Sequence, residues 1–223
     1  MVQGSYCKAS CSNHIEFKSY LWQGQPSHFP NAQFYVGSGS FYLLKEGQQN
    51  WGAGHFDSKL FDGLSAAELP RVAKDDPAKF PSAYIYSAKY DTAQSHFSWE
   101  TIGPFPNALD FFGDGSLYLV DAPGHLYGHV NCLVRTDPAS RWVYLGGDSC
   151  HHPDLLSGAK EIATWQTPQG GCGCVHTDKK ATEMNLGRIR SLSTLKQDKV
   201  EVILAHDFGW RKANAERFFP GTL

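Results

Sequence analysis

The stretch Asp121–His129 reads DAPGHLYGH, and it decides how the rest of the chain is interpreted. It follows Ser116–Val120, whose apolar and aromatic side chains predict a β-strand. Two later predicted strands end in a similar way: Arg141–Leu145 runs into Gly-Gly-Asp-Ser-Cys-His-His, and Val200–Leu204 runs into Ala-His-Asp. Each strand therefore leads within a few residues to small side chains and then to a His or an Asp.

These three strand ends are predicted to meet at one edge of a sheet. Val130–Thr136 follows the first strand, and the turn formers of Asp137–Ser140 predict a hairpin to the second. Strands that run up, down and up place His125 and Asp148 at the same edge. The strand after the last long helix can add His206 to that edge.

Imidazole and carboxylate groups that converge on loops suit Zn²⁺ or a similar transition metal. Glycines beside the ligands let the backbone approach an ion closely. A metal held in this way lowers the pKa of a bound water to ~7 and polarises a carbonyl, which permits hydrolysis of an ester, lactone, thioester or amide. Any one position alone is better explained as a turn histidine or a capping Asp. Three matching contexts favour a metal site formed by His125, Asp148 and His206.

The composition excludes several classes of protein. Twenty Lys and Arg against 22 Asp and Glu give a net charge of −2, so no basic surplus points to nucleic acid. With 41% hydrophobic and 19% charged residues, we expect a globular chain with a sizeable core, forming one domain over residues 1–223. No basic and apolar leader and no span of ~20 apolar residues is visible. We therefore expect a cytoplasmic protein with reduced cysteines and no membrane partner.

Local patterns predict the remaining elements. Ser65–Leu69 is expected to begin a helix, with Ser65 as N-cap and Glu68 three residues later. Apolar side chains at helical spacing predict a helix over Ala181–Lys196, and a short last helix is expected around Lys212–Phe218. Further short strands are expected at Gln33–Val36, Ser82–Ser87 and His96–Thr101, and Gly113–Gly115 is expected to form a turn before Ser116–Val120.

The same motifs carry a resemblance to a known family. The PGHLYGH part of Asp121–His129 resembles the Pro-Gly-His-x-x-Gly-His turn of metallo-β-lactamase-fold hydrolases. Leu145–Asp148 is similar to the strand end that carries their metal-bridging Asp, and Leu204–Asp207 to their last His strand. Three further stretches resemble a fungal branch of that family: Pro26–Ala32, Phe105–Ser116 and Phe218–Gly221. Members of this branch are lactonase-like or lactamase-like proteins, and several belong to secondary-metabolite gene clusters.

The resemblance implies an α+β fold, the metallo-β-lactamase-like αββα sandwich, with one or two metal ions. It implies His125 as a ligand of the first metal, Asp148 as a bridge and catalytic residue, and His206 as a ligand of the second. His129 corresponds to a residue that is more often a structural hydrogen bonder. His151 stands where related lactonases carry a Tyr that contacts the substrate carbonyl oxygen, so the resemblance implies a catalytic donor or acid there. The alternative is a histidine on the surface without a catalytic role.

The chain departs from the family pattern before Pro26. The family brings its other ligands in a His-x-His-x-Asp-His loop, whereas Asn13–Gln25 reads NHIEFKSYLWQGQ. Alignment on His14 leaves Glu16 and Lys18 in place of the second His and the Asp, and alignment on the later glycine and proline leaves no ligand. We expect residues 1–25 to be divergent and part of the first sheet to be missing. A degenerate, shortened copy and a gene model with a wrong start both explain this.

Three functional hypotheses follow. The first is a metal-dependent hydrolase that acts on a small metabolite in fungal secondary metabolism and holds one zinc ion, or two. The alternative is a catalytically impaired remnant with a binding role or none, and a third is a mononuclear iron oxidoreductase on the same fold. Cys172, Cys174 and His176 lack a second cysteine pair, so a flexible loop with free thiols is favoured over a metal or redox site. The sequence predicts no oligomeric state.

Overall fold

The computed structural model describes residues 26–44, 58–72, 97–137, 141–167, 170–192, 199–218 and 221. The chain divides into two compact units, one formed by Met1–Ser98 with Tyr127–Val130 and the other by Trp99–Leu126 with Asn131–Leu223. The strand predicted at Ser82–Ser87 lies outside the described residues, as does the divergent segment 1–25. The assignment of residues 1–223 to one domain stays a prediction.

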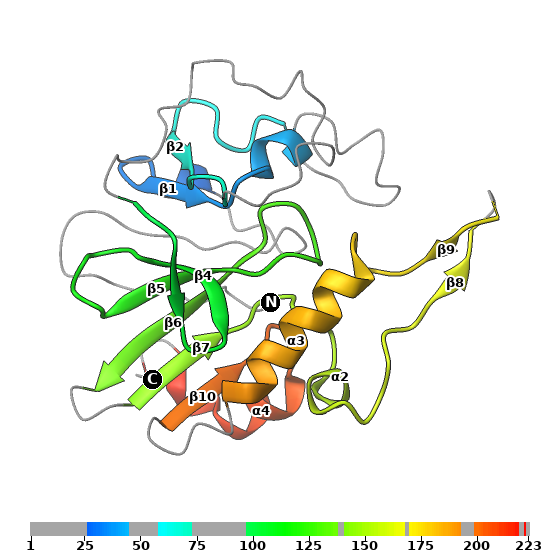
Figure 1. The fold of residues 1–223 in the computed structure, drawn as a ribbon. Coiled ribbons are helices and arrows are strands. Elements are labelled where there is room, and N and C mark those ends of the chain that lie inside the picture. The colour runs from blue at the N-terminus through cyan, green and yellow to red at the C-terminus, as the bar shows by residue number, and fades with distance from the viewer. Residues whose placement is uncertain are drawn as a thin grey trace. The chain divides into compact units, whose positions relative to one another are not determined.

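The second unit is built on a six-stranded sheet (Figure 1). Its strand order is β10-β7-β6-β5-β4-β3, so the predicted meander of three adjacent strands is confirmed as β5, β6 and β7. Strand β6 pairs antiparallel with β7, whereas β10 pairs parallel with β7. The strand bounds are β3 Glu100–Ile102, β4 Phe105–Asp110, β5 Leu117–Asp121, β6 Val130–Asp137, β7 Arg141–Leu145 and β10 Lys199–Ile203.

The predicted turn between β4 and β5 is closed by the carboxylate of Asp110. Its two oxygens accept hydrogen bonds from the backbone N–H of Gly113, at 2.9 Å, and of Gly115, at 2.8 Å. Both glycines have positive φ, 72° and 68°, which side chains with a Cβ rarely adopt. The Gly-Asp-Gly turn therefore follows directly from the local sequence.

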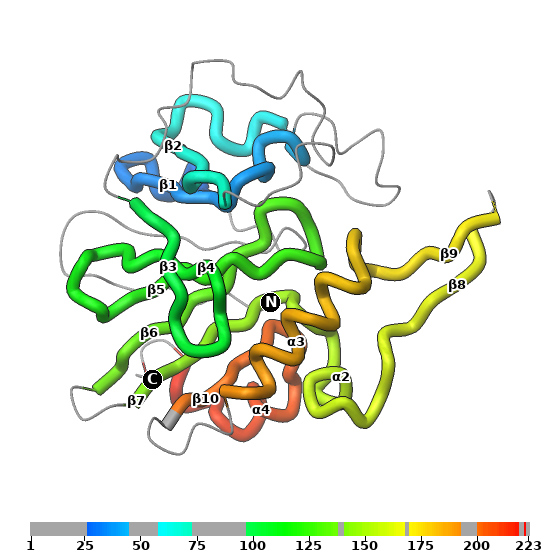
Figure 2. The backbone as a smooth tube through the Cα atoms, in the orientation of Figure 1, coloured from blue at the N-terminus to red at the C-terminus, as the bar shows by residue number. Residues whose placement is uncertain are grey.

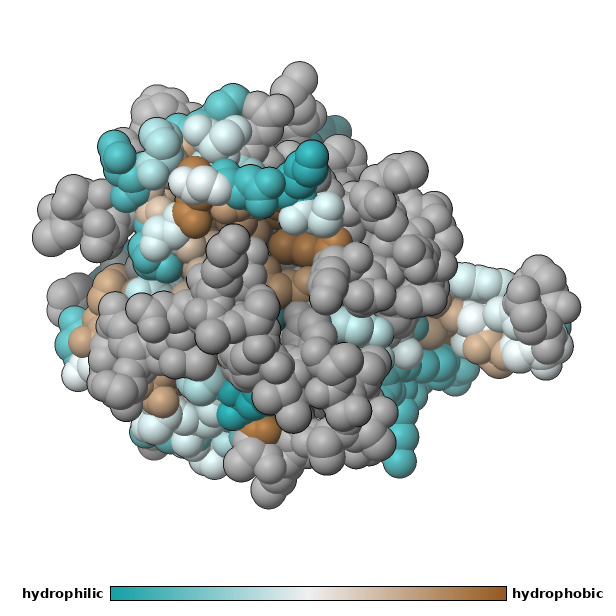
Figure 3. Space-filling view, turned by 90° about the horizontal axis from the view of Figure 1, so that it is seen from above, coloured by the Kyte–Doolittle hydropathy of each residue, from teal (hydrophilic) through white to brown (hydrophobic). Residues whose placement is uncertain are grey.

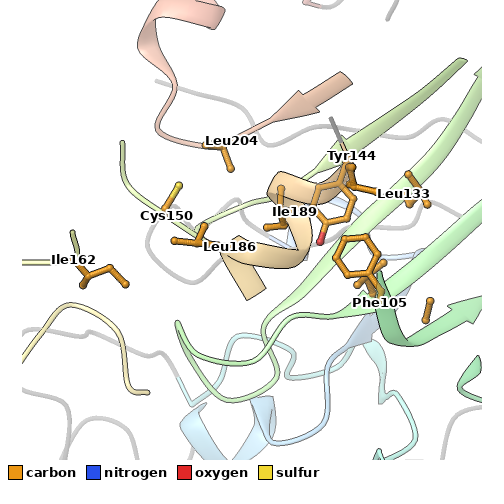
Figure 4. Packing of buried hydrophobic residues seen from close by; sticks show 11 residues of the cluster. Phe105, Leu133, Tyr144, Cys150, Ile162, Leu186, Ile189 and Leu204 are labelled. Atoms are coloured by element: carbon orange, nitrogen blue, oxygen red, sulfur yellow. The ribbon is translucent and has the colours of Figure 1, made fainter. Parts of the chain in front are cut away.

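Helix α3 (Lys179–Leu192) covers one face of the sheet, as predicted for the segment from residue 181 onward. Its buried Leu186, Ile189 and Leu192 belong to the same core cluster as Val120, Leu133 and Tyr144 of the strands. Phe105 also lies in this core, with its ring stacked on Tyr144 at a centroid distance of 5.1 Å and an interplanar angle of 6° (Figure 4).

Short helical segments follow two strands of the sheet, one after β7 and two after β10. Helix α2 spans Pro153–Ser157, α4 spans Phe208–Ala213, and the 3₁₀ turn η4 spans Ala215–Arg217. The prediction that the last helix begins near Lys212 was wrong by four residues. The earlier start has a local cause, because the side chain of Asp207 accepts a hydrogen bond from the backbone N–H of Trp210 at 2.7 Å and caps α4.

A two-stranded hairpin, β8 (Trp165–Gln166) with β9 (Cys172–Gly173), extends away from the sheet (Figure 2). In the space-filling view it stands out at the right with both hydrophobic and hydrophilic side chains (Figure 3). Cys172 is exposed, and the Cys174 thiol donates to the backbone oxygen of His176 at 3.0 Å. Both cysteines are free, as expected, but the segment is a hairpin and not an irregular loop.

The first unit holds η1 (Pro26–His28) and a parallel pair, β1 (Gln33–Val36) with β2 (Ser65–Glu68). The strand at β1 was predicted, but the helix expected from Ser65 was wrong. Glu68 lies at the end of strand β2, but its side chain caps a helical segment elsewhere in the first unit. Its carboxylate accepts from the backbone N–H of Gly39, at 3.1 Å, and of Phe41, at 2.9 Å, at the start of helical residues 40–44.

The α+β class predicted from the sequence is confirmed by the mixed sheet and its helices. In the part of the chain that the structure describes, no helix combines the length and apolar character needed to cross a membrane.

Candidate metal centre

The ends of β7 and β10 form the floor of the candidate site. The backbone pairing continues past both strands, because Gly146 N–H donates to the oxygen of Ile203 at 2.8 Å and Ala205 N–H donates to the oxygen of Gly147 at 3.0 Å. Since these strands are parallel, their following residues emerge at the same edge. Asp148 and His206 are therefore placed next to each other.

His125 is delivered by the loop after β5. Gly124 in this loop has φ +128°, and a Cβ there would lie 2.3 Å from Oγ1 and 2.4 Å from the backbone nitrogen of Thr182 in α3. Only glycine allows the loop to approach the helix so closely. The backbone oxygens of Gly124 and His125 also accept hydrogen bonds from the N–H groups of Asp178 and Thr177, at 2.9 and 3.0 Å. This contact with α3 fixes where the His125 ring stands.

The three predicted metal ligands are brought together. Asp148 has no exposed surface, and its Oδ1 lies 2.9 Å from Nε2 of His206. Its Oδ2 lies 3.9 Å from Nε2 of His125, which is also buried. The carboxylate thus stands between two imidazole rings that come from different strand ends.

The cluster leaves polar atoms unsatisfied. In the described part of the chain, neither oxygen of Asp148 and neither ring nitrogen of His151 forms a hydrogen bond, and Nε2 of His206 forms none either. A fully buried carboxylate that faces only the imidazole rings of His206 and His125 is costly unless those rings carry a proton. A cation offsets this cost, and one carboxylate with several imidazoles is a donor set that suits Zn²⁺. The residues present therefore fit a metal ion.

His151 lies inside the cluster and not on the surface. Ligand atoms of Asp148, His151 and His206 all lie within 4.8 Å of one another, a separation suited to holding one ion. The ring centroid of His151 is 4.6 Å from that of His206 and 5.2 Å from that of His125. Burial lowers the pKa of His151, and the Asp148 carboxylate opposes this shift. The ring is thereby favoured in its neutral form, which can bind a metal or share a hydrogen bond.

His176 also belongs to the cluster, a position that the sequence pointed to only through Cys172 and Cys174. Its ring is buried, and its Nδ1 lies 3.2 Å from Nδ1 of His125. Its ring centroid is 5.2 Å from that of His151. The signal for His176 in the sequence was weak. The predicted ligands each follow a predicted strand of the main sheet, whereas His176 follows the β8–β9 hairpin.

A buried hydrogen-bond network supports the segment that carries Asp148. Ser149 Oγ accepts from Nδ2 of Asn131 at 2.8 Å and from Nδ2 of Asn185 at 3.3 Å. Asn131 also donates to the hydroxyl of Tyr144 at 2.9 Å. Strands β6 and β7 and helix α3 are therefore joined to the residue next to Asp148.

Other residues singled out by the sequence lie elsewhere. His129 is buried in the first unit, and its structural role stays a prediction. Phe105 is a core residue, whereas Phe112 is half exposed. His14 and Glu16, considered as additional ligands, lie outside the described residues.

The chain was compared with protein-family models, with curated proteins and with solved structures. No family model matches the chain. A metallo-hydrolase of Annulohypoxylon moriforme is 57% identical over 56 residues, which cover 25% of this chain and 15% of that relative. A gamma-lactamase of Gibberella moniliformis is 55% identical over 53 residues, which cover 23% of this chain and 21% of that relative. Over these stretches the chain is similar to fungal metallo-hydrolases and gamma-lactamases, in keeping with the resemblance that its motifs carry.

A solved structure confirms the metallo-β-lactamase fold. A quorum-quenching N-acyl homoserine lactone lactonase superposes with a TM-score of 0.50 at 13% sequence identity, covering 88% of this chain and 57% of that one. The metallo-β-lactamase-like architecture predicted from the sequence is thus confirmed. The chain spans about a fifth or less of the length of the two curated relatives, and somewhat over half of the solved chain.

Proposed function

We propose that this chain is a metal-dependent hydrolase of an ester-type bond in a small molecule, with a lactone as the preferred substrate class. The observation that carries the proposal is the buried carboxylate of Asp148, which no hydrogen bond in the described chain satisfies and which faces His206 at 2.9 Å. Two similar proteins, a gamma-lactamase and a lactone lactonase, are named for the cleavage of cyclic acyl bonds. The name of a third, a metallo-hydrolase, is compatible with that reaction.

The proposed metal ligands are His125, Asp148 and His206, and the proposed ion is a single Zn²⁺. One ion is favoured over two because these ligands carry a single negative charge to offset a dication. A bound Zn²⁺ supplies a water of lowered pKa and a Lewis acid for the substrate carbonyl. Three protein ligands leave a coordination position open, which is the arrangement of catalytic zinc sites.

The remaining roles fall to the chain's own residues. His151 is proposed to donate to the carbonyl oxygen of the substrate, because its ring lies next to those of His206 and His125 and it is favoured in its neutral form. Asp148 is proposed to orient the proton of the attacking water as well as to hold the ion. Both roles use positions that the fold fixes through β7, β10 and α3.

The alternative of a non-catalytic remnant is not favoured. Without a metal, the fully buried carboxylate of Asp148 has only the imidazole rings of His125 and His206 to offset its charge, and such a buried charge is costly to the fold. A role in fungal secondary metabolism and a cytoplasmic location stay predictions from the sequence.

Metal analysis combined with a substrate panel tests the proposal. The purified protein is expected to hold about one zinc per chain and to open lactones faster than it cleaves linear amides. His125→Ala is expected to lose both the zinc and the activity, whereas His152→Ala, which removes an exposed histidine next to the cluster, is expected to keep both. A protein that contains no metal after zinc reconstitution, or His125→Ala with unchanged zinc, contradicts the proposal.

A further inference from the structure

We infer that His176 is a positioning residue for the metal centre, which it serves by accepting a hydrogen bond from Nδ1–H of His125. This inference rests on the proposed function, in which His125 is a metal ligand. The observation behind it is the 3.2 Å separation of the two Nδ1 atoms, which lie on two buried rings.

The tautomer of His125 follows from this contact. Two ring nitrogens at hydrogen-bond distance need one donor and one acceptor. When His125 carries its proton on Nδ1 and donates to His176, its Nε2 keeps the lone pair, and Nε2 is the atom that faces Oδ2 of Asp148. Metal-ligating histidines commonly fix their tautomer through a partner at the other ring nitrogen. His176 is therefore the partner that keeps Nε2 of His125 available to an ion.

The fold holds both rings in this register through their backbones. Thr177 N–H donates to the oxygen of His125 at 3.0 Å, and the Thr177 hydroxyl donates to the oxygen of Gly124 at 3.1 Å. The segment that carries His176 therefore runs alongside the loop that carries His125, and it continues directly into α3. The ring contact, with centroids 5.2 Å apart at 77°, is set by these bonds and not by the side chains alone.

Zinc affinity in competition with a chelator, together with the visible spectrum of the Co²⁺-substituted protein, tests this inference on the full chain. His176→Ala is expected to weaken zinc binding about 10- to 100-fold and to shift the Co²⁺ absorption bands, because the His125 ring loses its fixed orientation. His176→Asn places an amide oxygen near the position of Nδ1 and is expected to restore most of the affinity and the spectrum. His152→Ala is the matched control and is expected to leave both unchanged.

The outcomes separate this inference from the proposed function. Wild-type affinity and spectrum in a folded His176→Ala variant overturn the inference alone, since the wild-type protein still binds metal. A loss of zinc as complete as in His125→Ala, without rescue by His176→Asn, overturns it too, because His176 is then a ligand. A wild-type protein that binds neither zinc nor cobalt overturns the proposed function and the inference with it. Circular dichroism of each variant confirms the fold.

Discussion

Asp148 and His206 meet where the parallel strands β7 and β10 end, with Oδ1 of the carboxylate 2.9 Å from Nε2 of the ring. The two residues are 58 positions apart in the sequence, and the backbone bonds of Gly146 and Ala205 continue the strand pairing up to them. The contact is thus a product of sheet topology, and it supplies the negative charge and the imidazole that a cation needs at one point.

Replacement of the carboxylate by an amide tests the charge. Asp148→Asn is expected to keep the fold and lose metal binding, since the amide is neutral and its nitrogen is not a ligand. At a zinc concentration of about 100 times Kd, the wild-type protein gains about 2.7 kcal/mol in the free energy of unfolding, and the variant is expected to gain none. Thermal unfolding with zinc and with chelator measures the difference. An equal zinc-dependent shift in both proteins contradicts the assignment.

His151 is tested by separating catalysis from metal content. His151→Phe is expected to lower kcat by about 10²-fold or more, as loss of a donor to the developing oxyanion does, while the zinc content stays that of the wild-type protein. Initial rates on a lactone and metal analysis of the same sample measure both. Loss of the zinc shows instead that His151 is a ligand. His152→Phe serves as the neighbouring control.

Gly124 is expected to tolerate a side chain poorly. In Gly124→Ala the new Cβ meets Oγ1 and N of Thr182 at 2.3 and 2.4 Å, and φ is +128°. We expect a loss of about 3 kcal/mol or more in the free energy of unfolding, together with weaker zinc binding as His125 moves. Gly103 has φ +52° with open space around it, so Gly103→Ala is expected to cost only about 1–2 kcal/mol. Urea denaturation compares them, and equal losses contradict the steric argument.

Ser149 is expected to matter more for stability than the hydroxyl of Tyr144. Ser149→Ala removes the acceptor of Asn131 and of Asn185, leaving buried donors at a cost of about 1–3 kcal/mol. Tyr144→Phe is expected to cost about 1 kcal/mol, because Asn131 still donates to Ser149. Denaturant midpoints at equal m-values decide the order. A larger loss in Tyr144→Phe contradicts this view of the network.

Glu201 in β10 is expected to make a pH-dependent contribution to the free energy of unfolding through its bonds to Trp210 and Arg217. Arg217 donates to both of its oxygens at 2.7 Å and Trp210 donates at 2.8 Å, and these bonds lower its pKa below the ordinary 4.5 against an opposing effect of burial. The contribution is present above the unfolded-state pKa and disappears as the pH falls through the folded-state pKa. Since the carboxylate is 37% exposed, Glu201→Gln is expected to cost at most about 1 kcal/mol at pH 7.

Unfolding measured across the pH range tests that window. The difference between wild type and Glu201→Gln is expected to shrink as the pH falls below 4.5. Glu100→Gln, a change at an exposed acid of β3, is the control and is expected to show no such trend. A difference that stays constant from pH 7 to the acid range contradicts an ionic origin.

Strong local patterns allowed the main elements to be predicted. The meander, the Gly113–Gly115 turn, the long helix and the last strand each have a signal in a few consecutive residues. Ser65–Glu68 shows where such signals fail. A Ser followed by Glu at the third position fits a helix N-terminus, yet the same Glu68 caps the backbone of Gly39 and Phe41, which are 29 and 27 residues away. Local sequence cannot tell these two uses of a carboxylate apart.

The sequence by itself determined the ends of the strands and therefore that His125, Asp148 and His206 stand at one sheet edge, because alternation and turn chemistry are local properties. The tertiary structure alone decided the distances among these groups, the burial of the carboxylate and the presence of His176 beside His125. Those features depend on how α3 packs against the loop at Gly124 and on the backbone bonds between segments more than 50 residues apart. Such packing is a property of the whole folded unit, and no short stretch of the chain encodes it.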